Sequence, residues 1–276
     1  MSSIIDCHVH LNNYDGLNKT ENKVLSLQER LDALLENMNN NNIFYSILLS
    51  SYKVDENRPS TSQIIDIVKK NNYIDKIGVV AGFTIDNHTH EDLKNYKQWL
   101  KDDIIKGIKL YCGYEHYYPY DERYQVVYDM CIEFGCPIMI HTGDVFSQRA
   151  KVKYSHPLNI DDIAVDNPEL KIVMCHIGNP WITDCQEILY KNKNVYADIS
   201  GLIVGDFTIS GRTHYANKIK EILNYVDDPH RLLYGSDWPI SNMKSYIDFV
   251  QKLEFDEKSF DLLMFKNAKS LFKISL

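Results

Sequence analysis

Short apolar runs alternate with amphipathic stretches eight times along this chain, and no other feature constrains its fold as strongly. The apolar runs have the length of strands, whereas the amphipathic stretches have the period and length of helices. Strands that alternate with helices indicate a parallel sheet covered by helices. Eight such units in 276 residues match the size of a (β/α)8 TIM barrel. We therefore expect an α/β protein with a single domain over residues 1–276.

The positions of the expected elements follow from this pattern. Strands are expected at Ile4–His8, Ile43–Leu49, Ile77–Thr84, Gly107–Tyr111, Pro137–His141, Ile172–His176, Val195–Ile199 and Leu232–Ser236. Helices are expected at Ser26–Met38, Thr61–Lys70, Glu91–Leu100, Glu122–Phe134, Asp161–Val165, Trp181–Tyr190, His214–Val226, Lys244–Leu253 and Glu257–Phe272. An open doubly wound sheet is the alternative, but no GxGxxG or GxxxxGK[ST] turn follows the first strand.

Composition and charge exclude several classes of partner and location. Apolar residues make up 44% and charged residues 25% of the chain, as is typical of a globular protein. The net charge of −8 argues against nucleic acid or an anionic membrane as the main partner, so a small-molecule substrate is expected. No apolar run has the length of a membrane span. Six cysteines without a CxxC pair, behind an N-terminus without a signal sequence, predict reduced thiols and a cytoplasmic protein. The sequence leaves formation of a homodimer open.

Imidazoles and a carboxylate recur where the expected strands end. His8 and His10 close the first strand, and residues two apart on a strand share a face. Further polar residues end later strands: Lys109, His141, His176 and Asp237. Because barrel enzymes keep their chemistry at this end of the strands, we expect these side chains to point inward and meet at one mouth. The alternate positions are mostly apolar and are expected to face the helices: Val9, Ile108, Leu110, Ile138, Ile140, Val173, Cys175, Leu232 and Tyr234.

This set of side chains is typical of a metal site. Neutral imidazoles with one carboxylate suit Zn²⁺, and also Mn²⁺ or Fe²⁺. Three histidines and an aspartate leave one position open for water, whose pKa a metal lowers from about 15.7 toward about 7. A fourth histidine beside that water can act as base or acid. Each residue alone also has a structural interpretation: a hydrogen-bonded histidine, a helix-capping Asp237 or a snorkelling Lys109. The joint pattern is what favours a metal.

Six short segments between residues 5 and 272 form an ordered set. They read Ile5-Asp6-Cys7-His8-Val9-His10, Gly107-Ile108-Lys109-Leu110, Ile138-Met139-Ile140-His141-Thr142-Gly143, Cys175-His176-Ile177-Gly178-Asn179-Pro180-Trp181, Tyr234-Gly235-Ser236-Asp237-Trp238-Pro239 and Lys266-Asn267-Ala268-Lys269-Ser270-Leu271-Phe272. This set resembles the amidohydrolase superfamily, and within it the amidohydrolase-related group that includes aminocarboxymuconate-semialdehyde decarboxylase and several lactonases.

The resemblance implies a metal-dependent TIM-barrel enzyme. His8, His10, His141 and Asp237 would hold one divalent metal, and His176 would position or deprotonate the metal-bound water. Asp237 would also take a proton during the reaction. Lys109 matches a strand-four lysine that is carboxylated and bridges two metals in binuclear members of the superfamily. A single metal is the commoner arrangement in this group, so we expect one metal and a Lys109 that is unmodified or directed at substrate. A carboxylated Lys109 in a binuclear centre is the alternative.

Candidate substrate residues follow the strands. The segment 111–120 carries five tyrosines beside the expected mouth, which either form a substrate wall or cover the helix below, and Tyr111 is the candidate substrate residue among them. Arg149 and Arg212 lie on expected loops and either bind a carboxylate or are solvated charges. Together with Lys109 they predict a small carboxylate-bearing substrate. Trp238, next to Asp237, is a further candidate for substrate binding.

Two reactions fit these residues. The first is hydrolysis of an amide, lactone or ester of a small acid, in which activated water attacks the carbonyl and His176 moves the proton. The second is non-oxidative decarboxylation, in which an unsaturated or aromatic carbon is protonated and carbon dioxide leaves. The segment Gly-Ser-Asp-Trp-Pro favours the hydrolase by analogy with lactonase-type relatives. A catalytically inactive barrel is the third alternative, and the intact ligand set argues against it.

Overall fold

Eight parallel strands, paired in chain order, form the centre of the molecule. The computed structural model describes residues 3–14 and 24–275. The strands are β1 (Ile4–Val9), β2 (Ile43–Leu49), β3 (Ile77–Gly82), β4 (Ile105–Leu110), β5 (Pro137–Ile140), β6 (Lys171–Met174), β7 (Val195–Asp198) and β8 (Leu232–Leu233). The first strand also meets the segment that follows the last one. Cys7 N–H donates to the Tyr234 carbonyl at 3.0 Å, and Asp237 N–H donates to the His8 carbonyl at 2.8 Å. The sheet is therefore a barrel, which confirms the predicted fold.

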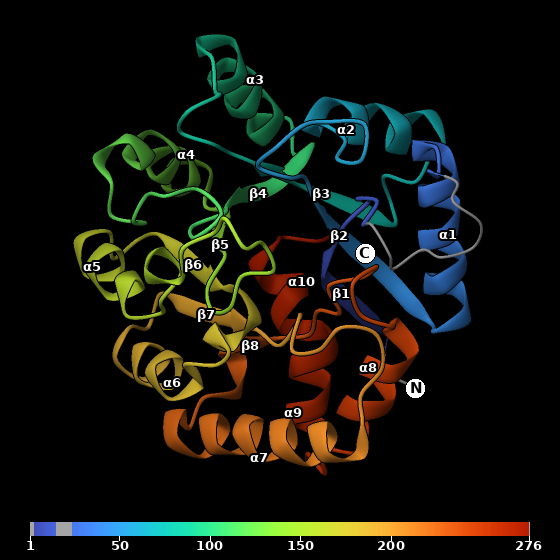
Figure 1. Cartoon of the computed structure of the whole chain (residues 1–276), viewed down its shortest axis with the longest axis vertical. Coiled ribbons are helices and arrows are strands. Elements are labelled where there is room, and N and C mark those ends of the chain that lie inside the picture. The colour runs from blue at the N-terminus through green and yellow to red at the C-terminus, as the bar shows by residue number, and fades with distance from the viewer. Residues whose placement is uncertain (1–2, 15–23, 276) are drawn as a thin grey trace.

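Helices surround the strands on the outside, as in other TIM barrels, except for the last one, which lies toward the centre of the view (Figure 1). They are α1 (Leu27–Asn40), α2 (Thr61–Lys70), α3 (His90–Lys101), α4 (Gln125–Phe134), α5 (Asn159–Asp166), α6 (Ile182–Lys191), α7 (Ile209–Val226), α8 (Met243–Val250), α9 (Glu257–Asp261) and α10 (Asn267–Leu271). Capping boxes fix the starts of the first three, at Ser26, Ser60 and Thr89. No helix in the described ranges is long and apolar enough to cross a bilayer.

Two apolar layers stabilise the barrel. The outer layer lies between strands and helices and contains most positions predicted to face the helices: Val9, Ile108, Leu110, Ile138, Ile140, Leu232 and Tyr234. The inner layer fills the barrel and combines strand residues such as Ile5 and Met139 with Leu271 and Phe272 from the C-terminal end. Ile274 lies in a hollow beside the starts of β3 and β4. The C-terminal segment therefore closes the end of the barrel where strands begin, and the carboxyl ends remain open.

The predicted orientation is wrong for Val173 and Cys175. Both belong to the inner layer rather than to the layer that faces the helices. β6 ends at Met174, and the chain then turns through a short 3-10 segment in which His176 has a φ of 63°. The alternation of a strand does not continue through such a turn, so a period of two counted back from His176 assigns the wrong face to both residues.

Helix boundaries differ from the prediction mainly near the C-terminus. α7 begins at Ile209, well before the expected start at His214, because Thr208 caps it by accepting a hydrogen bond from Gly211 N–H. The single helix expected at 257–272 is interrupted by a π-helical turn at Leu262–Lys266. All six cysteines are buried and unpaired, as predicted for reduced thiols.

Candidate metal centre

One cavity of about 650 Å³ opens at the carboxyl ends of the strands. It is lined by the six polar residues that the sequence places at strand ends: His8, His10, Lys109, His141, His176 and Asp237. These residues come from β1, from β4 and from the segments that follow β1, β5, β6 and β8. The barrel thus brings together side chains that are far apart in the sequence.

The rings of His8 and His10 are fixed so that one nitrogen of each faces Asp237. Nδ1 of His8 donates to Asp198 Oδ2 at 2.9 Å, and Nδ1 of His10 donates to the Leu49 carbonyl at 2.9 Å. Each acceptor is an oxygen without a proton, so the proton must lie on Nδ1 and Nε2 is left with its lone pair. Nε2 of His8 and Nε2 of His10 lie 3.7 and 3.4 Å from Asp237 Oδ1.

The charge state of this group fits a divalent cation. Burial, reinforced by the charge of Lys109, lowers the pKa of His8 to about 4, so the ring is neutral at pH 7. Burial opposes ionisation of Asp237, but its proximity to His10 and the other histidines outweighs this and lowers its pKa to about 2. Two imidazole lone pairs and a carboxylate oxygen therefore converge in a buried space. A cation placed among them would satisfy all three.

His141 lies at the same cavity but outside this trio. The described residues form two trios with ligand atoms within 4.8 Å of one another, His8–His10–Asp237 and His8–His176–Asp198, and neither includes His141. Nε2 of His141 donates to the Asp144 carbonyl at 2.8 Å, which leaves Nδ1 as the free nitrogen. Burial and the adjacent His176 lower the pKa of His141, so this ring too is neutral.

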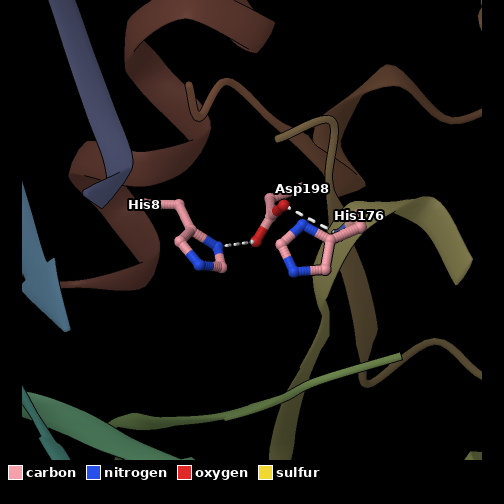
Figure 2. A group of neighbouring side chains, drawn as sticks. All are labelled: His8, His176 and Asp198. Carbon is pink, nitrogen blue, oxygen red and sulfur yellow. Dashed lines mark hydrogen bonds and ion pairs between the residues drawn. The ribbon is translucent and has the colours of Figure 1, made fainter. Parts of the chain in front are cut away.

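Asp198, at the end of β7, connects the candidate metal centre to His176 (Figure 2). Its Oδ2 binds Nδ1 of His8, and its Oδ1 accepts the backbone N–H of His176 at 3.0 Å. Oδ1 also accepts the backbone N–H of Ser200 at 3.1 Å and the Ser200 hydroxyl at 2.5 Å. Burial raises the pKa of Asp198, but the neighbouring His8 and its hydrogen bond, together with His176 and Lys109, outweigh this and lower it, so Asp198 is an anion.

Ser200 sets the protonation of the His176 ring. Nδ1 of His176 lies 3.1 Å from the Ser200 carbonyl and 2.9 Å from its hydroxyl oxygen, whose own proton goes to Asp198. Both contacts require a donor, so Nδ1 carries the proton and Nε2 is the basic nitrogen. A chain of hydrogen bonds therefore runs from His176 through Ser200 to Asp198 and on to His8.

The backbone around these residues is strained where it forms the site. His176 and Asp237 both have left-handed φ values, 63° and 62°, which side chains other than glycine rarely adopt. Gly201 packs directly against both. A β-carbon on Gly201 would lie 2.4 Å from Nδ1 of His176 and 3.0 Å from Oδ2 of Asp237, so any larger residue here would displace the His176 ring.

The structure brings some of the predicted substrate residues to the cavity and not others. Tyr111, Lys109 and Arg149 line the cavity, and the Tyr111 hydroxyl donates to the Ser50 carbonyl at 2.6 Å. Arg212 lies in the first turn of α7, with its guanidinium over the Phe207 ring, and is not among the lining residues. Trp238 pairs with Val9 as a parallel bridge and packs against the outer layer. The structure therefore does not bring Arg212 or Trp238 to the cavity.

The sequence reasoning overlooked several residues of the site. Asp198 ends a strand and could have been found by the same argument as Asp237. Ser200 carries no comparable signal. Tyr14, Tyr52 and Arg58 also line the cavity, from loops without a recognisable motif.

Comparison with known proteins identifies the family. A family model described as amidohydrolase matches residues 5–274. The chain belongs to the amidohydrolase family. No curated protein sequence matches this amidohydrolase.

Solved structures share the fold of this amidohydrolase over nearly its whole length. An uncharacterized TIM-barrel protein from Bordetella bronchiseptica has a TM-score of 0.75 at 19% identity, with 99% of each chain covered. A protein assigned as a 2-pyrone-4,6-dicarboxylic acid hydrolase from Pseudomonas putida has a TM-score of 0.70 at 15% identity, with 100% of this chain and 99% of the other covered. A 5-carboxyvanillate decarboxylase from Novosphingobium aromaticivorans, complexed with manganese, has a TM-score of 0.69 at 13% identity, with 99% and 96% covered.

Proposed function

We propose that this amidohydrolase is a metal-dependent hydrolase that cleaves an amide, lactone or ester bond of a small, carboxylate-bearing substrate. The observation that carries the proposal is the convergence of Nε2 of His8 and Nε2 of His10 on Asp237 Oδ1, in a cavity that also contains His176. His8, His10, His141 and Asp237 would hold one divalent ion, with Zn²⁺, Mn²⁺ or Fe²⁺ matching the donors. When bound, the ion would supply Lewis-acid activation of water or of a carbonyl oxygen.

His176 is the proposed proton carrier. Its Nδ1 proton is held by Ser200, so Nε2 accepts a proton from the attacking water and returns it to the leaving group. Asp198 stabilises the imidazolium that forms, because it is an anion connected to the ring through the Ser200 hydroxyl. Asp237 is the second group able to take a proton.

Arg149 is the proposed binding residue for the substrate carboxylate. It is exposed at the cavity, and no described residue forms an ion pair or side-chain hydrogen bond with its guanidinium. An arginine fork binds a carboxylate through two parallel hydrogen bonds. In a protein of net charge −8, this positive group would also favour the approach of an anion.

Three tyrosines form a wall beside the proposed carboxylate site. The rings of Tyr52 and Tyr114 stack with centroids 5.5 Å apart, and Tyr111 lies 5.3 Å from Tyr52. The Tyr114 ring also contacts His141 at 4.9 Å, so the wall reaches the candidate metal centre. Such a surface suits a flat acyl or ring portion of a substrate.

Decarboxylation is the second candidate. The decarboxylase from Novosphingobium aromaticivorans is as similar in fold to this chain as the protein assigned as a hydrolase, with TM-scores of 0.69 and 0.70. The same cavity could position an aromatic acid for protonation by His176. Hydrolysis is preferred by analogy, because the segment Gly235–Pro239 resembles that of lactonase-type relatives.

The test is a substrate panel measured for two products. Protein loaded with Zn²⁺ or Mn²⁺ is offered lactones, esters and amides of small dicarboxylic acids, together with aromatic acids, while acid release and carbon dioxide are followed. We expect acid release that disappears in His176→Ala. Arg149→Met should raise KM for anionic but not for neutral substrates, whereas Arg123→Met, on an exposed arginine paired with Asp121, should change neither. Carbon dioxide without hydrolysis would establish the second candidate, and no turnover by loaded protein would overturn both.

A further inference from the structure

Lys109 and Cys175 are in unusually close contact inside the barrel. Nζ of Lys109, on β4, lies 2.6 Å from Sγ of Cys175, which follows β6, and both side chains are fully buried. An N–H···O hydrogen bond spans about 2.9–3.0 Å, and sulfur is larger than oxygen, so an N–H···S bond should be longer still. The separation is nevertheless too long for a direct nitrogen–sulfur bond. It is the distance that one intervening light atom would span.

Among the described residues no carboxylate forms an ion pair with Lys109, although the charge of Asp198 acts on both Lys109 and Cys175. Cys175 is the only hydrogen-bond partner of Nζ among the described residues, and the ring of Tyr111 lies 5.4 Å away. A buried ammonium paired only with a thiol is costly, because a thiol is a weak hydrogen-bonding group. Burial likewise raises the pKa of Cys175. Both groups would be better accommodated in an uncharged, covalently joined form.

We propose that Lys109 and Cys175 are a modification site, at which a peroxide joins Nζ to Sγ through one oxygen atom. The bridge forms one N–O and one O–S bond and breaks one N–H and one S–H bond. Two molecules of hydrogen peroxide accept the four electrons: one of their oxygen atoms stays in the bridge, and the other three leave as water. Four equivalents of a thiol reverse the reaction and yield the amine, the thiol, water and two disulfides.

The cavity gives the oxidant access to this pair. Lys109 is among the residues that line the cavity, so a molecule as small as hydrogen peroxide would approach the buried Nζ from there. Peroxide oxidises a cysteine sulfur first to a sulfenic acid, and at Cys175 that group would form in contact with Nζ of Lys109. The inference does not depend on the proposed hydrolysis, because the contact includes none of the proposed ligands and needs no bound metal.

Peptide mass spectrometry tests the bridge directly. The protein is treated with hydrogen peroxide, alkylated under denaturing conditions without reductant, and digested with trypsin. We expect peptides 107–123 and 172–191 to be joined, with a mass that exceeds their sum by one oxygen less two hydrogens. Trypsin should fail to cleave after Lys109, and peroxide labelled with heavy oxygen should place its label in the joined species. Incubation with a dithiol should restore both free peptides.

Matched variants separate this bridge from other chemistry. Cys175→Ser and Lys109→Met should each abolish the joined species, whereas Cys185→Ser, which removes a buried thiol on α6, should preserve it. Joined peptides that lack the extra oxygen would overturn the proposal. So would oxidation of Cys175 to a sulfinic acid while trypsin still cleaves after Lys109, or a joined species that persists in Cys175→Ser.

Discussion

Asp198 accepts a hydrogen bond from Nδ1 of His8 at 2.9 Å, while the opposite nitrogen of the same ring faces Asp237. Asp198 therefore determines which nitrogen of His8 is free to bind a metal. In metal sites generally, removing the group that hydrogen-bonds the second nitrogen of a ligating histidine weakens metal binding by about 10–100-fold.

Replacing Asp198 should weaken metal binding. Asp198→Asn removes the charge that fixes the His8 proton, and we expect the Kd for Zn²⁺ or Mn²⁺ to rise by about 10–100-fold. Competition with a chromophoric chelator measures this constant. Asp162→Asn, an exposed carboxylate on α5, is the control and should bind as the wild type does. Equal affinity in both variants would mean that His8 does not need Asp198.

Removal of the His176 ring should affect rate more than metal content. Because other residues complete the proposed ligand set, His176→Ala should retain most of its metal and lose about 10²–10⁴ in kcat. Elemental analysis and turnover are measured on the same preparation. A variant that is purified without metal would instead identify His176 as a ligand.

Two glycines of one loop allow the contact with His176 to be separated from backbone strain. Gly201 and Gly205 have similar left-handed φ values, 63° and 73°, but a β-carbon on Gly205 would meet nothing within 4 Å. Both alanine variants should lose about 1 kcal/mol of stability. Gly201→Ala alone should lose about 10²-fold in kcat, because it displaces His176. Similar kcat values in the two variants would contradict this role.

Metal removal should lower thermal stability and be reversible. A ligand that binds only the folded state stabilises it by about 2.7 kcal/mol at 100 times its Kd. Chelation should therefore lower Tm, and added Zn²⁺ or Mn²⁺ should restore it, with about one ion per chain by elemental analysis. Two ions per chain, with a carbamate on Lys109, would replace the mononuclear centre by a binuclear one.

Glu115 should make the protein less stable as pH rises. Burial raises its pKa to about 7 from the usual 4.5, and its Oε2 is buried without a hydrogen-bond partner. Between these two values the folded state binds more protons than the unfolded state, so the free energy of unfolding falls with increasing pH. Glu115→Gln should gain about 3 kcal/mol relative to the wild type between pH 4.5 and 8. Urea unfolding at several pH values measures the difference, with exposed Glu169→Gln as a control that should show none.

The sequence was sufficient for the barrel because its eight units each repeat the same physical pattern. It also placed His8, His10 and Asp237 at one mouth, since the carboxyl ends of parallel strands share one edge. The side-chain orientation of residues near the end of a strand was not predictable in the same way. The left-handed turn at His176 interrupts the alternation, and the faces of Val173 and Cys175 were reversed as a result.

The residues that hold the candidate ligands in place could not be derived from the strand pattern, because the pattern does not show which atoms face each other. Asp198 and Asp237 are both aspartates that close a strand, and only the position of His8 between them shows that one binds Nδ1 and the other faces Nε2. Arg212 was predicted to bind substrate, but the structure places it away from the cavity. The capped start of α7 extends into the predicted loop and carries its guanidinium toward Phe207.

The candidate centre joins the first strand of the chain to the segment after the last one, and this has a consequence for how each molecule matures. Synthesis proceeds from the N-terminus, so His8 and His10 emerge from the ribosome long before Asp237. Until that aspartate appears, the two histidines have no carboxylate to complete their set. Loading of the proposed metal would therefore be a late event, and a nascent chain that stops before residue 237 would lack a complete candidate centre even if its earlier strands were already paired.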